Sequence, residues 1–311
     1  MTKSRKSRST AEPNSSPATS YIGRFAPSPT GPLHLGSLIC ALASYLDARQ
    51  QGGLWLMRME DLDPPREEAG AAQRILDSLS AHGLDWDGPT LWQSQRLEAY
   101  ADTVQELLDQ QLAFRCDCSR ARLLGQENIY RGRCRSRQIA NSTAAAVRVI
   151  VSDDSVIELV DRLQAPLTQN LAEELGDFIV RRKDQLFAYQ LAVVLDDAYQ
   201  GVTQVLRGSD LYDSTPRQIY LQRLLGLPTP GYAHIPVITN NAGQKLSKQT
   251  HAPALDDNKA LANLKLALRF LGQPAPSAEC QQVDQLLVEA VANWQLQAVP
   301  AVPGIPETAL Y

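Results

Sequence analysis

The sequence predicts an α/β fold built on a doubly wound parallel sheet. Two observations lead to this prediction. Apolar, strand-like segments alternate with amphipathic helical segments along the chain, and polar or charged residues follow several of the expected strands at their carboxyl ends. In open α/β sheets, ligands bind at those carboxyl ends. The 311 residues suffice for one large α/β domain or for two smaller ones.

Composition and charge narrow the class of protein. Apolar residues make up 44% of the chain and charged residues 21%, as in ordinary globular proteins. The formal net charge of -4 argues against non-specific binding of polyanions but leaves room for a local basic face. No apolar run approaches the roughly 18 residues of a membrane span, and the N-terminus lacks the apolar core of a secretory signal. We therefore expect no membrane partner and a cytoplasmic location.

Residues 1–20 are rich in Ser, Thr and Pro and carry four basic side chains. This composition predicts a disordered tail. Its charge could contact RNA, although a solvated tail is the more frequent role of such a segment.

The first structured stretch, residues 21–37, indicates a nucleotide site. It reads YIGRFAPSPTGPLHLGS, which is a strand, then a loop dense in Pro and Gly, then the start of a helix expected over 38–50. The prolines stiffen the loop, and the free N–H groups at the helix start favour a phosphate. Arg24 adds a charge that neutral packing would not need. The alternative is a purely structural Pro-rich turn.

The next elements continue the alternation. We expect a strand over 54–59 that delivers the acidic segment 60–63, a helix over 67–82, a loop over 86–92 and a second helix over 96–111. Strand, helix, strand, helix is the opening of a doubly wound sheet.

Thiols recur at close spacing in the middle of the chain. The five cysteines are Cys40, Cys116, Cys118, Cys134 and Cys280, an odd number without a secretion signal, so disulfides are not expected. The central three could bind zinc, which takes four donors in a tetrahedron. The fourth donor could be Tyr130, Asp117 or water, since no His lies nearby. The alternative is three free thiols.

Arginines alternate with small or polar residues over 131–137, which could form a basic arm for nucleic-acid phosphates or a solvated charged face. A strand over 146–151 and its expected hairpin partner over 156–160 belong to an insertion between two halves of the sheet. The second half is expected to begin with a strand over 176–180, followed by a helix over 186–198.

Arg207 follows the next expected strand, 202–206, and is a candidate ligand-binding residue. An unpaired guanidinium at the carboxyl end of a buried strand would be costly, so Arg207 is difficult to interpret as an ordinary packing residue. Tyr189 stands at a helix start, where a tyrosine is more often a core residue than a ligand. A helix over 217–225 and a last strand over 234–238 complete the expected sheet.

That strand leads into a loop with two lysines three residues apart, Lys245 and Lys248. A Gly-containing loop of this kind can bring positive charge to a triphosphate as charge develops on it during reaction. The remaining chain is expected to be helical over 255–272 and 283–297.

Two motifs resemble the signatures of class I aminoacyl-tRNA synthetases. His34-Leu35-Gly36-Ser37 resembles the HIGH motif, and the segment 245–249 resembles KMSKS, with Leu246 and Gln249 as departures that bear on loop closure. The longer run FAPSPTGPLHLG resembles the glutamyl and glutaminyl branch of that class. The resemblance implies a Rossmann-type catalytic domain that joins an amino acid to ATP, releasing pyrophosphate and leaving an aminoacyl-adenylate.

The resemblance also implies site residues. Two arginines favour a dianionic acid, glutamate, over glutamine. Lys248 and His34 are expected to act in catalysis, with Mg²⁺ accompanying the ATP. The glutamate-binding residues would be Arg24, Ala26, Ser28, Glu60, Tyr189 and Arg207, and the ATP-binding residues His34, Gly36, Lys245, Ser247 and Lys248.

Residues 21 to about 300 are similar to the glutamyl-Q tRNA(Asp) synthetase family. In that family the pattern C-x-C, eleven residues, Y-x-x-x-C binds one structural zinc, and it matches Cys116, Cys118, Tyr130 and Cys134. Only about 60 of the 311 residues follow the lysine loop, so no anticodon-binding domain is expected. The resemblance implies transfer of glutamate to the queuosine base of tRNA(Asp), by a protein that we expect to be a monomer.

The expected organisation has five parts. These are a tail (1–20), the first half of the catalytic domain (21–112), a zinc-binding insertion (113–165), the second half with the lysine loop (166–250) and a small C-terminal helical subdomain (251–311). Three other functions stay open. They are a shortened glutamyl-tRNA synthetase that charges a 3′ end, a nucleotidyltransferase acting on a small molecule, and a non-catalytic zinc module that binds RNA.

Overall fold

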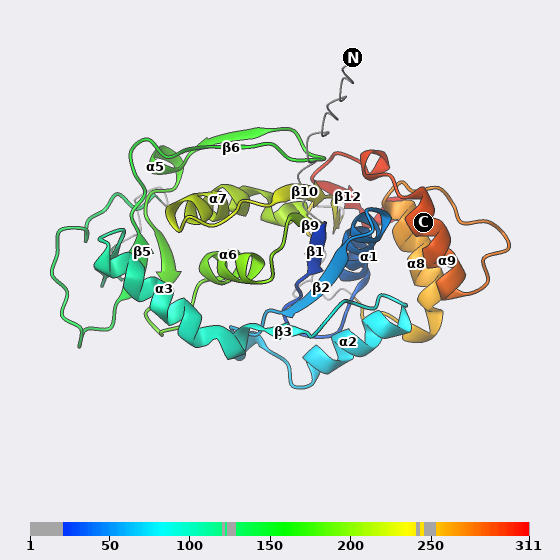
Figure 1. The fold of residues 1–311 in the computed structure, drawn as a ribbon, viewed down its shortest axis with the longest axis horizontal. Coiled ribbons are helices and arrows are strands. Elements are labelled where there is room, and N and C mark those ends of the chain that lie inside the picture. Colours follow the sequence, from blue (N-terminus) through cyan, green and yellow to red (C-terminus); the bar gives the residue numbers. More distant parts are fainter. Residues whose placement is uncertain (1–20, 120–121, 123–128, 241–242, 246–252, 311) are drawn as a thin grey trace, which may run out of the picture.

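A parallel sheet forms the centre of the computed structural model, which describes residues 21–119, 122, 129–240, 243–245 and 253–310 (Figure 1). Its strands are β1 (Ile22–Phe25), β2 (Leu54–Met59), β3 (Leu91–Trp92), β9 (Gln204–Gly208) and β10 (Gly231–Ile235). β1, β2 and β3 pair in parallel, as do β9 and β10. The two groups adjoin where the Thr203 N–H donates to the Ile22 carbonyl at 2.9 Å. The spatial order β3-β2-β1-β9-β10 confirms the predicted doubly wound arrangement.

Helices cover both faces of this sheet and form a separate hydrophobic core on each face. α1 (Leu35–Gln50) and α2 (Ala71–Ala81) share one hydrophobic core with β1 and β2, whereas α6 (Tyr189–Tyr199) and α7 (Thr215–Leu224) belong to a second core. Alternate residues of β9 and β10 enter opposite cores, because successive side chains on a strand point to opposite faces. Leu206 and Ala233 enter the first core, and Val205 and Tyr232 the second.

The inserted region has sheets of its own, and two sequence-based predictions about it are wrong. α3 (Leu97–Asp109) leads into an antiparallel sheet of β4 (Ala113–Cys116), β5 (Ala146–Val149) and β8 (Phe178–Arg181), while β6 (Val156–Leu159) pairs with β7 (Leu167–Asn170). The strand expected over 156–160 is therefore not the partner of the strand over 146–151. The strand expected over 176–180 joins β5 rather than the parallel sheet. Alternation of apolar residues predicts a strand but does not indicate which other strand it pairs with.

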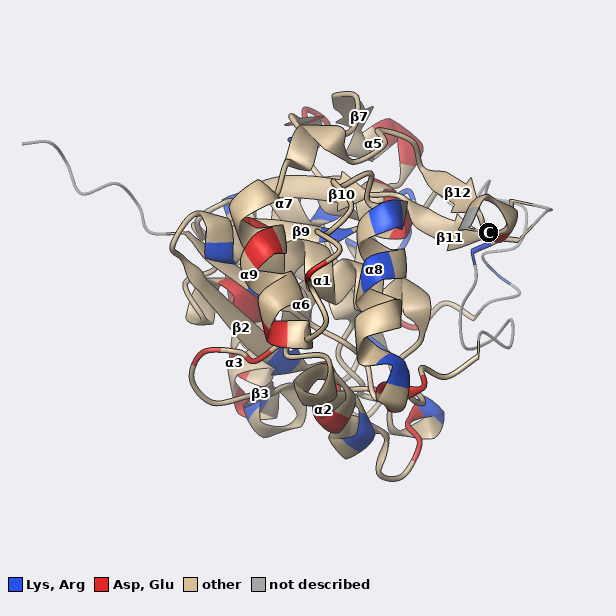
Figure 2. Ribbon diagram, turned by 90° about the vertical axis from the view of Figure 1, so that its right-hand side faces the viewer, with Lys and Arg blue, Asp and Glu red and all other residues tan. Residues whose placement is uncertain are grey.

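The C-terminal region packs against α1. α8 (Ala260–Phe270) and α9 (Val283–Asn293) lie side by side over that helix (Figure 2). The strand expected over 234–238 is divided, because Pro236, which has no N–H to donate, separates β10 from β11 (Val237–Thr239). β12 (Gly304–Pro306), which was not predicted, pairs with β11.

Several boundaries also differ from expectation. α1 begins at Leu35 rather than at 38, and α2 begins at Ala71 rather than at 67, after Gly70 with φ of 73°. The short helices are α5 (Leu171–Glu174) and the 3₁₀ turns Pro64–Arg66, Gln93–Arg96, Ser209–Ser214, Asp257–Lys259, Leu296–Ala298 and Glu307–Leu310. The tail predicted over 1–20 lies outside the described residues. Among the residues that the structure describes, no helix is both long enough and apolar enough to span a membrane.

Candidate active site

A cleft of about 630 Å³ opens at the carboxyl ends of β1, β9 and β10, beside the start of α1. This is where the strand order of the parallel sheet reverses, the usual ligand position in such sheets. Ser247 and Lys248 lie outside the described residues. All the other predicted glutamate and ATP residues line this cleft, namely Arg24, Ala26, Ser28, His34, Gly36, Glu60, Tyr189, Arg207 and Lys245.

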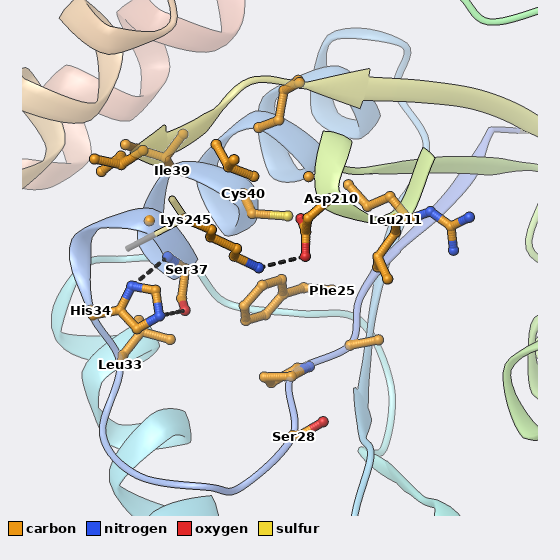
Figure 3. Close-up of a pocket in the computed structure, with 18 of the residues that line it drawn as sticks. Phe25, Ser28, Leu33, His34, Ser37, Ile39, Cys40, Asp210, Leu211 and Lys245 are labelled. Atoms are coloured by element: carbon orange, nitrogen blue, oxygen red, sulfur yellow. Dashed lines mark hydrogen bonds and ion pairs between the residues drawn. The ribbon is translucent and has the colours of Figure 1, made fainter. Parts of the chain in front are cut away.

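His34 caps the N-terminus of α1 at the edge of the cleft (Figure 3). Its Nδ1 accepts from the Ser37 N–H at 3.3 Å, and its Nε2 lies 3.1 Å from Ser37 Oγ. A Cβ on Gly36 would lie 3.2 Å from His34 Cε1, so a glycine leaves room for the imidazole over the first turn. This helix start presents backbone N–H groups and the positive end of a helix dipole, which suit a phosphate.

Lys245 lies beside the start of α1 in the same cleft and pairs with Asp210 at 2.5 Å (Figure 3). Both side chains are partly exposed, at 44% and 30%, so water screens the pair and its contribution to stability is small. Cys40 lines the cleft nearby, and burial raises the pKa of its thiol to about 11. The thiol is therefore neutral at physiological pH. Because the ion pair between Lys245 and Asp210 is exposed and weak, an anionic ligand in the cleft could replace Asp210 as the partner of Lys245.

Four charged side chains, three of them buried and Glu60 nearly so, form a cluster on the β1–β2 side of the cleft. Asp197, from α6, accepts from Arg24 Nε at 3.1 Å and from an Arg58 nitrogen at 2.7 Å, and Arg58 also reaches Glu60 at 3.3 Å. Burial by itself would raise the pKa of Asp197, but the guanidinium groups of Arg24 and Arg58 hold it below its ordinary value. Burial raises the pKa of Glu60 despite Arg58.

Arg207 differs from Arg24 because its direct partners are uncharged. It is 3% exposed, and its Nε donates to His234 Nε2 at 3.0 Å. One terminal nitrogen donates to Thr215 Oγ1 and Gln218 Oε1, each at 2.8 Å, and the other lies 3.4 Å from Tyr189 Oη. Within the described part of the chain no carboxylate forms an ion pair with Arg207. The long contact with Tyr189 leaves one edge of the guanidinium able to bind an anion.

The three central cysteines converge on one buried point, away from the cleft. The Sγ atoms of Cys116, Cys118 and Cys134 lie within 4.8 Å of one another, and the last two are 3.5 Å apart. The Tyr130 hydroxyl lies 3.4 Å from Cys116 Sγ and 3.8 Å from Cys118 Sγ. Ligand separations of about 3.5–3.8 Å follow from a tetrahedron with metal–ligand bonds of about 2.0–2.3 Å. This cluster could hold a metal ion.

Arginines flank the thiols. Arg137 donates to Cys134 Sγ at 3.4 Å and pairs with Asp117 at 2.6 Å, and the Arg148 guanidinium lies 4.0 Å from the centre of the Tyr130 ring. Cationic neighbours of this kind stabilise thiolates, which are the metal-binding form of cysteine. In the arginine run 131–137, Arg137 and Arg135 are therefore engaged within the protein, the latter with buried Asp177 at 2.5 Å.

Sequence reasoning missed several residues that organise the site. Arg58 and Asp197 were not singled out, although two adjacent aspartates near the end of an apolar helix were a usable signal. Asp161 and His234, which support Arg207, and Asp210, which pairs with Lys245, were also missed. They lie far from their partners in sequence, so only the fold reveals these contacts.

Comparisons with known proteins identify the family of this chain. Residues 22–270 match the family described as tRNA synthetases class I (E and Q), catalytic domain. The chain is 55% identical to glutamyl-Q tRNA(Asp) synthetase of Thiobacillus denitrificans over 93% of this chain and 98% of that one. It is 50% identical to the protein of the same name in Pseudomonas fluorescens, over 95% and 99% of the two chains.

A solved structure shows the same fold. Glutamate-tRNA synthetase from Elizabethkingia anophelis superposes with a TM-score of 0.77 and 23% identity, over 92% of this chain and 68% of that one. The family match, the relatives that align with nearly the whole chain, and the fold all lead to one conclusion. The chain is a ligase of the class I aminoacyl-tRNA synthetases, in the glutamyl and glutaminyl group, and belongs within it to the glutamyl-Q tRNA(Asp) synthetase family.

Proposed function

We propose that the protein activates L-glutamate with ATP to form glutamyl-adenylate and transfers the glutamate to the queuosine base of tRNA(Asp). The single observation that carries the activation step is the cleft itself. It places Arg207, a buried guanidinium whose direct partners among the described residues are all uncharged, in one cavity with the phosphate-favouring start of α1. The acceptor is supported by the names of the relatives that match nearly the whole chain.

Glutamate recognition follows from the charges that line the cleft. Arg207 and Arg24 attract the two carboxylates of the substrate, and Glu60 accepts from its ammonium group. An ammonium beside Glu60 stabilises the ionised carboxylate, offsetting the effect of burial on its pKa. Tyr189 and Ser28 offer neutral hydrogen bonds, and the Ala26 backbone completes the substrate-binding wall.

ATP lies, in this proposal, with its phosphates between the start of α1 and the lysine loop. An oxygen of the substrate carboxylate attacks the α-phosphorus, the bond from that phosphorus to the bridging oxygen breaks, and pyrophosphate leaves with the electron pair. His34, Gly36 and Ser247 position the nucleotide, and Lys245 and Lys248 stabilise the charge that develops on the pyrophosphate. Mg²⁺ would add positive charge to the phosphates. No side chain forms a covalent bond to the substrate, so catalysis is positioning and charge stabilisation.

Pyrophosphate exchange tests the activation step. Purified protein is incubated with ATP, glutamate and labelled pyrophosphate in the absence of tRNA, and label incorporated into ATP is measured. We expect exchange that depends on glutamate and is far weaker with glutamine. Absence of exchange with any amino acid would favour the non-catalytic RNA-binding alternative.

A second experiment locates the acceptor. Labelled glutamate is transferred to tRNA(Asp) that contains or lacks queuosine, and nuclease digestion shows which nucleotide carries the label. We expect label at the queuosine position only. Label at the 3′-terminal nucleotide, independent of queuosine, would identify a shortened glutamyl-tRNA synthetase instead.

Lys248→Ala is expected to lower kcat for adenylate formation by about 10²–10³-fold, the usual cost of losing one preorganised group that stabilises transition-state charge. The KM for glutamate should change little, because the lysine would contact the phosphates. Pyrophosphate exchange at several glutamate concentrations measures both. An increase in the glutamate KM with unchanged kcat would mean that the lysine loop belongs to the amino acid site.

We also propose that one structural Zn²⁺ binds to Cys116, Cys118, Cys134 and Tyr130. Three buried thiols suit zinc, which binds cysteine sulfur readily in a tetrahedron, and the nearby Tyr130 oxygen would be the fourth donor. The Cys134 N–H donates to Tyr130 Oη at 3.1 Å, which stabilises negative charge on that oxygen. The ion would hold the arm between β4 and β5 against the sheet, with no part in the chemistry.

Metal analysis checks this site. Protein purified without chelators is expected to contain about one zinc per chain, and Cys134→Ser should reduce that content and expose the insertion to proteolysis. Pyrophosphate exchange should persist in the variant, because the cluster lies outside the cleft. Protein that folds fully and contains no metal would exclude the zinc.

We also propose the five-part organisation that the sequence predicts. Residues 21–112 and 166–250 would form the two catalytic halves, although β8 completes the sheet of the insertion at 113–165. The cluster of thiols has its own small core, which supports a separate insertion. The helical subdomain is 251–311, and the tail is 1–20. We propose a monomer that acts in the cytoplasm, where ATP and tRNA are both present.

A further inference from the structure

His234 and Asp161 form a chain of hydrogen bonds behind Arg207. Arg207 on β9 and His234 on β10 are register partners in the parallel sheet, so the backbone fixes their separation. Arg207 Nε donates to His234 Nε2 at 3.0 Å, and His234 Nδ1 lies 2.6 Å from Asp161 Oδ2. The side chains of Asp161 and His234 are both 0% exposed.

Asp161 is held as an oriented carboxylate. Its Oδ1 accepts from three backbone N–H groups, those of Leu163, Gln164 and His234, at 2.9–3.2 Å. Only Oδ2 faces the imidazole. Three backbone donors on one oxygen favour the ionised form, so Asp161 can only accept a hydrogen bond from the ring.

The partners at both ends then fix the state of the imidazole. Arg207 Nε–H cannot accept a hydrogen bond and the Asp161 carboxylate cannot donate one, so His234 must be neutral with its proton on Nδ1. The orientation of the ring is fixed as well. It stacks on Tyr232 with 6.1 Å between centroids and meets Tyr212 edge-on at 5.2 Å.

In this arrangement the imidazole of His234 separates Arg207 from the Asp161 carboxylate. A carboxylate in direct contact with a guanidinium would form a strong bidentate pair and compete with a ligand carboxylate for the same donors. Arg24 shows the other case, because it shares Asp197 with Arg58. At Arg207 the imidazole, Thr215 and Gln218 occupy three N–H groups, and Gln218 is itself oriented by Gln190 at 2.8 Å. The terminal nitrogen near Tyr189 remains for a ligand.

We propose that Asp161 and His234 are positioning residues for glutamate specificity: through the neutral imidazole they fix the guanidinium of Arg207 without neutralising it, so that its edge facing the cleft binds a substrate carboxylate. This inference rests on the proposed function, in which Arg207 binds glutamate.

Asp161→Asn is the principal test, because it preserves shape. The amide oxygen must take the side with three backbone N–H groups, which turns the NH₂ group toward His234 Nδ1 and forces the ring proton onto Nε2, against Arg207 Nε–H. We expect the glutamate KM in pyrophosphate exchange to rise about tenfold or more, the usual effect of one buried unsatisfied donor. The kcat and the ATP KM should change less than about threefold.

A pair of substitutions at His234 adds a rescue test. His234→Leu removes the acceptor for Arg207 Nε, whereas His234→Gln can retain one, so the glutamate KM should rise more in the leucine variant. Asp177→Asn is the matched control, since Asp177 is equally buried, accepts from the Val151 N–H and pairs with Arg135 away from the cleft. It should lower the melting temperature without raising the glutamate KM.

The outcomes separate this inference from the proposed function. Absence of glutamate-dependent exchange in the wild-type protein would contradict the proposed function itself. Normal wild-type exchange with an unchanged glutamate KM in folded Asp161→Asn and His234→Leu would overturn the positioning role alone. Equal losses in kcat, ATP KM and glutamate KM, matched by the Asp177 control, would also overturn it, because they indicate a purely structural effect.

Discussion

Arg207→Gln is expected to raise the KM for glutamate by about 100-fold or more while the KM for ATP stays nearly constant. Removing a buried cation from a hydrogen-bonded charge pair costs about 2–5 kcal/mol, and every 1.4 kcal/mol is a factor of ten in affinity. In the free protein the glutamine amide can still donate to Thr215 or Gln218, which limits the loss of stability. Steady-state pyrophosphate exchange measures both constants.

Selectivity is a sharper readout of the same substitution. If Arg207 binds the side-chain carboxylate of the substrate, the variant should lose most of its preference for glutamate over glutamine. If it binds the α-carboxylate, the binding of glutamate and of glutamine should weaken equally. An unchanged glutamate KM in folded Arg207→Gln protein would show that the amino acid binds elsewhere.

Asp197→Asn is expected to lower the free energy of unfolding by about 3–5 kcal/mol, because it leaves the buried guanidinium groups of Arg24 and Arg58 without their shared anion. Glutamate activation should fall as well, since Arg24 lines the cleft and depends on Asp197 for its orientation. Urea unfolding and pyrophosphate exchange measure the two effects.

The difference in the free energy of unfolding between the wild-type protein and Asp197→Asn should depend on pH in a definite direction. The pKa of Asp197 in the folded protein lies below the unfolded value, because the two arginines outweigh the effect of burial. The stabilisation is therefore fully present above the unfolded pKa, about 4, and is lost as pH falls through the folded pKa. Wild-type protein should exceed Asp197→Asn in stability at pH 7, and the margin should shrink below about pH 4. A margin that grows on acidification would contradict the ion cluster.

Much of the fold was predictable from local sequence signals. The loop rich in Pro and Gly after β1 and the polar residues after β2 and β9 indicated the sheet and the edge where the cleft opens. The helix expected over 186–198 is present, although it begins at Tyr189 rather than at 186. These signals are local, because each depends on a few consecutive residues whose spacing reflects one element.

The errors arose where the structure depends on distant residues. β5 looked like half of a hairpin, yet it lies between β4 and β8, and nothing in its own residues specifies those partners. The two-residue strand β3 is too short for a periodic pattern, and it forms because β2 offers a free edge. In the same way, nothing near Arg24 in the sequence indicates its ion pair with Asp197, which lies 173 residues further along the chain.

A crystal structure with ATP and glutamate bound tests the central claim most directly, namely that the cleft at the start of α1 binds both substrates. We expect one glutamate carboxylate within hydrogen-bond distance of the Arg207 guanidinium, and the ATP phosphates between the N-terminus of α1 and Lys245. Glutamate bound away from Arg207, or phosphates bound outside the cleft, would contradict the claim.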